Sequence, residues 1–127
     1  MKQIIIIIFF LAFAEISAFA QSKTTEPTAQ TDAKGITTTT LNVSGNCGMC
    51  KRRIEEACVL KGVKAAKWDA KTGVLALTFD AKRTNLAKIG AAIAKAGYDN
   101  EQAKSTDKKY NKLPQCCQYR AEGAAKH

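Results

Sequence analysis

The spacing of apolar residues through the middle of the chain switches between the period of a strand and that of a helix, and this restricts the fold more than any other feature. A strand, a helix, two strands and a second helix are predicted, in that order, at 39–43, 48–60, 63–68, 74–79 and 86–96. A weaker strand is expected at 98–103. The order βαββαβ predicts an α+β, ferredoxin-like sandwich, with two helices on one face of a four-stranded antiparallel sheet.

The first twenty residues differ in composition from this central region. Lys2 precedes an apolar run of eleven residues from Ile4 to Ala14, and Ala18-Phe19-Ala20 then forms a small-residue cleavage site. The run is shorter than the roughly 20 residues that span a bilayer. We therefore expect a signal peptide at 1–20 that is cleaved after export, and a periplasmic or secreted mature protein that does not span a membrane.

The segments on either side of the predicted domain, which we place at 37–103, differ from each other. Residues 21–36 are rich in Thr, Ser, Gln and Ala and hold no large apolar residue before the last position, so a flexible linker is expected. The C-terminal tail at 104–127 is charged at first and then carries Tyr110, Leu113 and Tyr119. We expect these three side chains to pack against the domain.

The formal net charge of +9 does not by itself identify a partner. An excess of this size could attract nucleic acid, anionic lipid or an acidic protein surface, but export argues against nucleic acid. The positive charges are spread along the chain, and only Lys51-Arg52-Arg53 forms a tight cluster. This cluster is interpreted either as a solvated helix face or as a docking site for an acidic partner.

Two of the five cysteines, Cys47 and Cys50, lie where the first strand is expected to turn into the first helix. This placement brings both thiols close enough to bind one ion. The positive end of the helix and the adjacent basic cluster favour the thiolate form. Thiolates are soft ligands, so copper(I) is the expected ion, with mercury(II) or another thiophilic ion as an alternative.

Other uses of a C-x-x-C pair fit the surrounding residues less well. Haem attachment needs a histidine after the second cysteine, where Lys51 stands, and a zinc site lacks its second ligand pair because the only histidine is His127. A thioredoxin-like protein usually has an aromatic residue where Asn46 stands. A thiol–disulfide redox protein nevertheless stays the main alternative, and a structural metal-clamped module of an export complex is a third.

The residues around the pair resemble the heavy-metal-associated domain family over about 37–103. The resemblance implies a ferredoxin-like fold, a metal ion bound by Cys47 and Cys50, and Tyr98 in a loop that shields the metal. The chain departs from the family pattern in having Gly45-Asn46 directly before the first cysteine, without the usual methionine. The matching segments are Val43-Ser44-Gly45-Asn46-Cys47-Gly48-Met49-Cys50, Ile54-Glu55, Gly62-Val63, Thr78-Phe79-Asp80 and Ala96-Gly97-Tyr98-Asp99.

Different roles are expected for the other three cysteines. Cys58 lies about 12 Å along the helix from Cys50, too far to share an ion, and is expected to be a buried apolar residue. Cys116 and Cys117 are candidates for a second soft-metal site, for additional ligands of the first site, or for disulfides that tether the tail. The sequence thus predicts a non-catalytic metal carrier or scavenger, whose partners are the ion and either a metal-transporting membrane protein or another metallochaperone.

Overall fold

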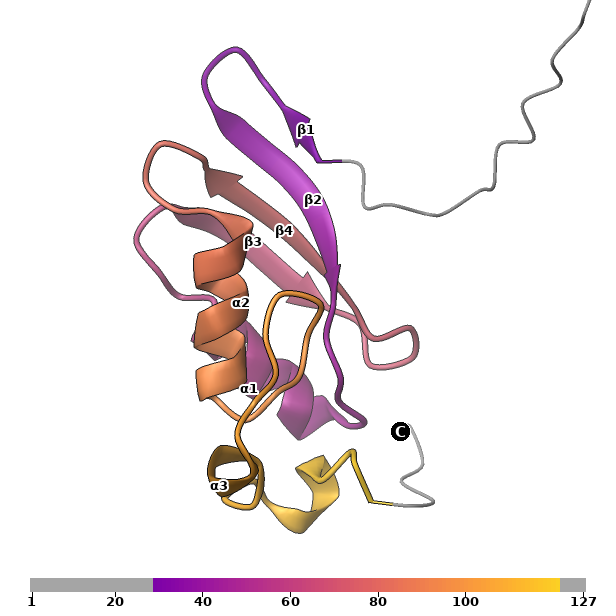
Figure 1. The fold of residues 1–127 in the computed structure, drawn as a ribbon. Coiled ribbons are helices and arrows are strands. Elements are labelled where there is room, and N and C mark those ends of the chain that lie inside the picture. The colour runs from indigo at the N-terminus through magenta and orange to yellow at the C-terminus, as the bar shows by residue number, and fades with distance from the viewer. Residues whose placement is uncertain (1–28, 122–127) are drawn as a thin grey trace, which may run out of the picture.

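The computed structural model describes residues 29–121, so the predicted signal peptide, the first half of the predicted linker and the last six residues of the tail lie outside the described residues (Figure 1). Within these residues, no helix combines the length and apolar character needed to cross a membrane. The elements in chain order are β1 (Gln30–Thr31), β2 (Ile36–Asn42), α1 (Gly48–Ala57), β3 (Val63–Trp68), β4 (Val74–Asp80), α2 (Leu86–Lys95), α3 (Asp107–Tyr110) and the short 3-10 helix η1 (Gln115–Cys117).

The four strands form one antiparallel sheet in the order β1-β2-β4-β3, and α1 and α2 cover one face of it (Figure 1). Alternation along β4 points Leu75, Leu77 and Phe79 into the core, as predicted. The amphipathic helices bury Ile54 and Ile89 against this layer. The α+β, ferredoxin-like arrangement predicted from the sequence is confirmed.

The sheet edge beside β2 differs from the sequence prediction. The strand expected at 98–103 is reduced to a single antiparallel bridge between Val43 and Asn100. The Asn100 side chain explains this, because its Oδ1 accepts the backbone N–H groups of Gln102 and Ala103 and turns the chain away from the edge. The other end of the edge pairs with β1, which lies in the segment expected to be linker.

The residues after the domain form an ordered cover at the end of the sandwich where α1 begins (Figure 1). Tyr110 and Leu113 are buried, and the Tyr119 ring stacks on Tyr98 with centroids 5.9 Å apart. Leu113 lies directly over Gly97, where a Cβ atom would come within 2.8 Å of its side chain. The expected packing of these three tail side chains is confirmed, and the same segment brings η1 next to α1.

Candidate metal centre

The loop that carries Cys47 rests on the indole ring of Trp68. A Cβ atom at Gly45 would lie 2.9 Å from that ring, so only glycine permits this close approach. The indole Nε1–H donates to the Val43 carbonyl at 3.1 Å and joins the end of β2 to β3. This fully buried ring therefore sets the height of the loop above the sheet.

Cys47 is the N-cap of α1, which places the thiols of Cys47 and Cys50 on the first turn of that helix. The Cys50 backbone N–H donates to Cys47 Sγ at 3.4 Å, and the two Sγ atoms lie 3.3 Å apart. The sequence predicted that these two cysteines lie together, and in the structure their sulfurs are within reach of one ion. Both cysteines are free thiols.

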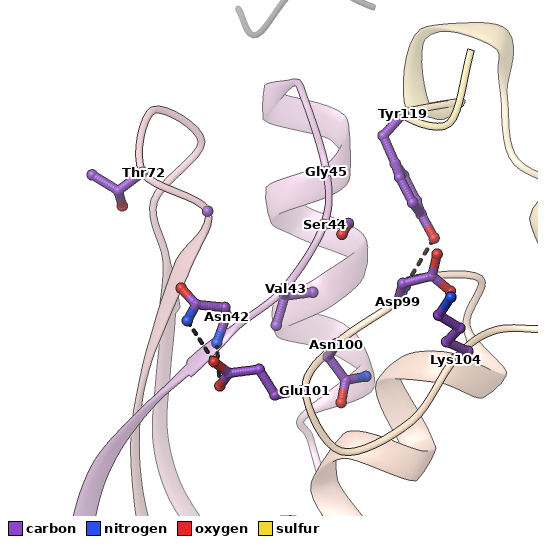
Figure 2. A pocket seen from close by; sticks show the side chains of 11 residues that line it. Asn42, Val43, Ser44, Gly45, Thr72, Asp99, Asn100, Glu101, Lys104 and Tyr119 are labelled. Atoms are coloured by element: carbon purple, nitrogen blue, oxygen red, sulfur yellow. Dashed lines mark hydrogen bonds between the residues drawn. The ribbon is translucent and has the colours of Figure 1, made fainter. Parts of the chain in front are cut away.

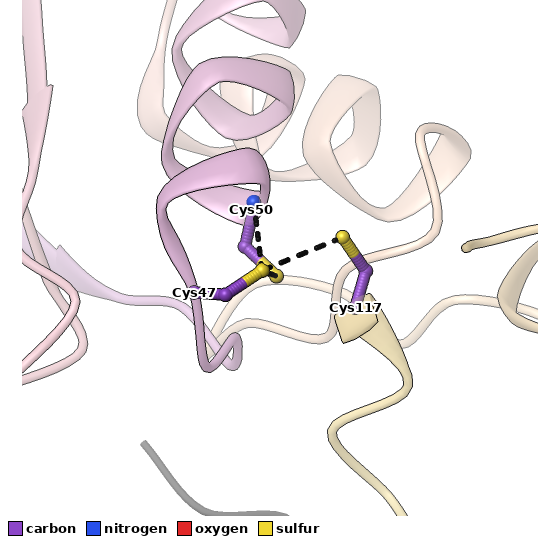
Figure 3. A group of neighbouring side chains, drawn as sticks. All are labelled: Cys47, Cys50 and Cys117. Atoms are coloured by element: carbon purple, nitrogen blue, oxygen red, sulfur yellow. Dashed lines mark hydrogen bonds between the residues drawn. The ribbon is translucent and has the colours of Figure 1, made fainter. Parts of the chain in front are cut away.

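A third sulfur reaches this pair from the C-terminal tail. Cys117, at the end of η1, places its Sγ 3.7 Å from that of Cys47 (Figure 3). The three ligand atoms of Cys47, Cys50 and Cys117 all lie within 4.8 Å of one another. Cys50 and Cys117 are completely buried, whereas Cys47 is partly exposed, so solvent reaches the cluster from the side of Cys47.

The three thiols have different electrostatic surroundings. Burial acts to raise the pKa of Cys47, but hydrogen bonds from the Cys50 backbone and from the thiols of Cys50 and Cys117 outweigh it and lower that pKa. Burial raises the pKa of Cys117 well above its ordinary value. The cluster thus holds one thiol that ionises readily beside one that keeps its proton until a metal displaces it.

The basic cluster predicted to favour thiolate has another structural role. Lys51 forms an ion pair with Glu55 and donates to the Trp68 carbonyl at 2.7 Å, so it braces α1 against β3. Cys50 is instead contacted by the side chain of Asn46, whose Oδ1 accepts the thiol hydrogen at 3.3 Å. Hydrogen bonds near the start of α1 are therefore the main cause of the lowered Cys47 pKa.

Tyr98 lies beside the two buried sulfurs, those of Cys50 and Cys117. Its ring is completely buried, and its hydroxyl makes no hydrogen bond of normal geometry even though it neighbours the thiols of Cys117 and Cys50. Burial is the main cause that raises the Tyr98 pKa, so the group stays a neutral O–H donor. A buried donor without an acceptor fits a site where thiols become thiolates, which accept hydrogen bonds.

The remaining two cysteines do not join the cluster. Cys58 is buried in the core as predicted, and burial raises its thiol pKa to about 11. Cys116 is exposed, with its Sγ 4.0 Å from the sulfur of Met49 and 3.9 Å from that of Cys117. The adjacent tail cysteines therefore differ in burial, and only Cys117 lies against the predicted pair.

A cavity of about 590 Å³ is lined in part by residues 42–45, which lead into the loop of Cys47 (Figure 2). Among the residues that the structure describes, its lining contains no cysteine or histidine. Its acidic groups are already engaged, since Glu101 accepts from Asn42 and Asp99 from Arg120. The sulfur cluster, and not this cavity, holds the reactive groups of the domain.

Comparison with known proteins points to the same segment. The model of the family described as "Heavy-metal-associated domain" matches residues 40–99. No curated protein matches the chain significantly.

Three solved structures are similar to the chain. A provisionally assigned copper-ion-binding protein from Bacillus anthracis str. Ames is 32% identical, with a TM-score of 0.51, over 54% of this chain and 100% of that one. Oxidized MerP from Ralstonia metallidurans CH34 is 31% identical, with a TM-score of 0.50, over 52% and 94% of the two chains. A CopZ metallochaperone is 31% identical, with a TM-score of 0.48, over 50% and 97%.

Proposed function

Because the chain belongs to the heavy-metal-associated domain family, we propose that it is a carrier of a soft metal ion, copper(I) in the first place, held by Cys47 and Cys50. The observation that carries this proposal is the 3.3 Å separation of their sulfurs on the first turn of α1. Thiolate sulfur prefers copper(I) and similar ions over hard ions such as magnesium. The Bacillus relative with 32% identity carries a provisional description as copper-ion-binding. Mercury(II) is the alternative cargo, because it is also a soft ion that prefers thiolate ligands.

The proposed role is transport or scavenging without catalysis, in the compartment to which the expected signal peptide directs the protein. Cys47 is the partly exposed member of the pair, and Cys50 is fully buried. A thiol of an acceptor protein can therefore approach the ion from the side of Cys47 and replace Cys47 as a ligand. The proposed acceptor is a metal-transporting membrane protein or another metallochaperone.

A competition titration tests this proposal. Reduced protein is titrated with copper(I) under anaerobic conditions in the presence of a chromogenic chelator that binds copper(I) tightly. We expect the protein to withdraw one copper per chain from the chelator, because the described residues contain one cluster of thiols close enough to share an ion. Failure to compete at any protein concentration would reject copper(I) as the cargo, and the same titration with mercury(II) then tests the alternative.

The affinity for copper(I) is expected to fall steeply as the pH is lowered. Each thiol must lose its proton to bind, so below its pKa each one weakens binding by about tenfold per pH unit. Cys47 and Cys50 together should give a fall of at least about 100-fold per unit. The slope is shallower above the lowered pKa of Cys47, which is ionised there before the metal arrives. Titrations across mildly acidic to neutral pH, corrected for protonation of the chelator, measure the slope, and a flat profile contradicts thiolate binding.

A thiol–disulfide redox protein is the second candidate function, because the Cys47 thiol has a lowered pKa and lies next to a second thiol. A redox protein of this type would reduce the disulfides of insulin without any metal. Turnover of insulin by metal-free protein supports the redox function. Inertness in that assay together with copper(I) binding supports the carrier.

A further inference from the structure

We propose that Cys117 supplies a third thiolate to the ion and that the C-terminal tail is built to hold it there. The inference rests on the proposed function, in which Cys47 and Cys50 bind a soft ion. It adds that the loop pair is completed by a ligand from 67 residues further along the chain, which converts a two-sulfur site into a three-sulfur site.

The distances between the sulfurs fit three-coordination. Metal–thiolate bonds are about 2.3 Å long, so three sulfurs around one ion in a plane lie about 4 Å apart. The Sγ atoms of Cys47 lie 3.3 Å from Cys50 and 3.7 Å from Cys117, and all three lie within 4.8 Å of one another. Small side-chain adjustments are therefore sufficient to place an ion among them.

The surroundings of Cys117 also fit a ligand. Its thiol is completely buried against the loop, so it is part of the cluster rather than a surface group. The unpaired Tyr98 hydroxyl lies beside both Cys117 and Cys50. When these thiols lose their protons to bind an ion, Tyr98 gains an acceptor, which removes the cost of a buried donor without a partner.

The first anchor of the tail is the side chain of Tyr119, two residues after Cys117. Its hydroxyl accepts the Asp99 N–H at 2.8 Å, a bond visible in Figure 2, and donates to the Gly97 carbonyl at 2.9 Å. Both partners flank Tyr98, on which the Tyr119 ring stacks. The tail is thereby fixed to the same loop that carries the buried hydroxyl of the site.

The second anchor is Arg120, which we assign as a positioning residue because it touches no sulfur. Its guanidinium donates to both oxygens of Asp99, at 2.9 and 2.7 Å, and to Asp107 at 2.9 Å. It also lies over the Tyr110 ring, 4.4 Å from the centroid. Although burial acts to raise it, the pKa of Asp99 is lowered, with Arg120 as the leading cause, so the pair stays charged at neutral pH.

The binding step is an exchange of protons for a metal ion. Each thiol that is still protonated releases its proton to solvent, three sulfur–copper bonds form, and copper stays in the +1 state. No electron donor or acceptor is needed. The exposed Cys116 is not included, since its sulfur points to Met49 and not to Cys47 or Cys50.

X-ray absorption spectroscopy of the protein loaded with one copper(I) counts the sulfurs directly. The sample is freed of chelator and thiol reductant before measurement. We expect three sulfur neighbours in the unaltered protein and two in Cys117→Ser, whose copper(I) affinity should fall by about 100-fold or more, beyond the effect of changing an outer-shell partner. The matched control is Cys116→Ser, which should keep three sulfurs and unchanged affinity.

Arg120→Ala tests the positioning role without removing a thiol. Because Arg120 donates to Asp99 and Asp107 rather than to a ligand itself, we expect the copper(I) affinity of the variant to fall by about 10-fold, the low end of the effect of changing a group bonded to a ligand, and its average sulfur number to fall toward two. Circular dichroism confirms that each variant is folded. Unchanged affinity and sulfur number in Arg120→Ala would overturn the assignment of this residue.

The result for the unaltered protein decides the main inference even if a variant does not fold. If the unaltered protein shows two sulfurs per copper and these are lost when Cys47 and Cys50 are replaced, Cys117 is not a ligand. The proposed function is then still supported. Three sulfurs that persist in Cys117→Ser overturn the identity of the third ligand. Absence of copper(I) binding in the unaltered protein overturns the proposed function itself, and the inference with it.

Discussion

The double replacement Cys47→Ser, Cys50→Ser is expected to lower copper(I) affinity by at least about 1,000-fold, which corresponds to about 4 kcal/mol. The loss is large because both thiolates of the helix turn are removed, and serine hydroxyls are poor ligands for a soft ion. Cys117 alone cannot compete with a chelator. The competition titration used for the unaltered protein measures the change.

The structure provides a matched control for this variant. Cys58 lies at the end of the same helix, is as buried as Cys50, and is not part of the cluster, so Cys58→Ala should leave copper(I) affinity unchanged. The double variant itself should fold, because a hydroxyl at position 50 can still donate to the Asn46 side chain that now accepts from the thiol. Tight copper(I) binding by the folded double variant would contradict the site assignment.

Trp68→Ala is expected to lower the free energy of unfolding by about 3–5 kcal/mol, the usual cost of deleting a large aromatic side chain from a core. The indole is only 1% exposed, fills the space under Gly45 and donates to the Val43 carbonyl. Its loss leaves a cavity directly beneath the loop of Cys47. The destabilisation corresponds to a fall in Tm of about 10–20 °C.

Denaturant unfolding followed by circular dichroism measures this effect, because Trp68 is the only tryptophan and its fluorescence disappears with it. Trp68→Phe is the matched control: it retains most of the apolar volume and loses the Nε1–H, so it should cost clearly less. We also expect weaker copper(I) binding in the folded fraction of Trp68→Ala, since the loop has lost its support. Equal stability of the alanine variant and the unaltered protein would show that the indole does not hold the loop.

The sequence predicted the parts of this molecule that follow from local patterns. Alternation in 74–79 predicted the buried face of β4. The proximity of Cys47 and Cys50 followed from their spacing at the start of a helix. Each of these features is determined by residues within one or two turns of one another.

The feature that the sequence left open depends on long-range contacts. The role of Cys117 depends on the path of the tail, which is fixed by Tyr119 and Arg120 against residues about twenty positions earlier. No periodicity reports such a contact. The strand expected at 98–103 fails for a different, local reason, because the Asn100 side chain accepts backbone N–H groups two and three residues later and turns the backbone.

The two ends of the described chain meet the domain at very different distances from the sulfurs. β1 pairs with β2 at Thr37, and about 20 Å of extended chain separates this point from Val43, just ahead of the thiol loop. Ala121, by contrast, follows Cys117 by four residues. A histidine tag fused directly after Ala121 would therefore be separated by only four residues from a thiol of the cluster, whereas a label or surface tether joined ahead of β1 is far along the chain from the partly exposed Cys47.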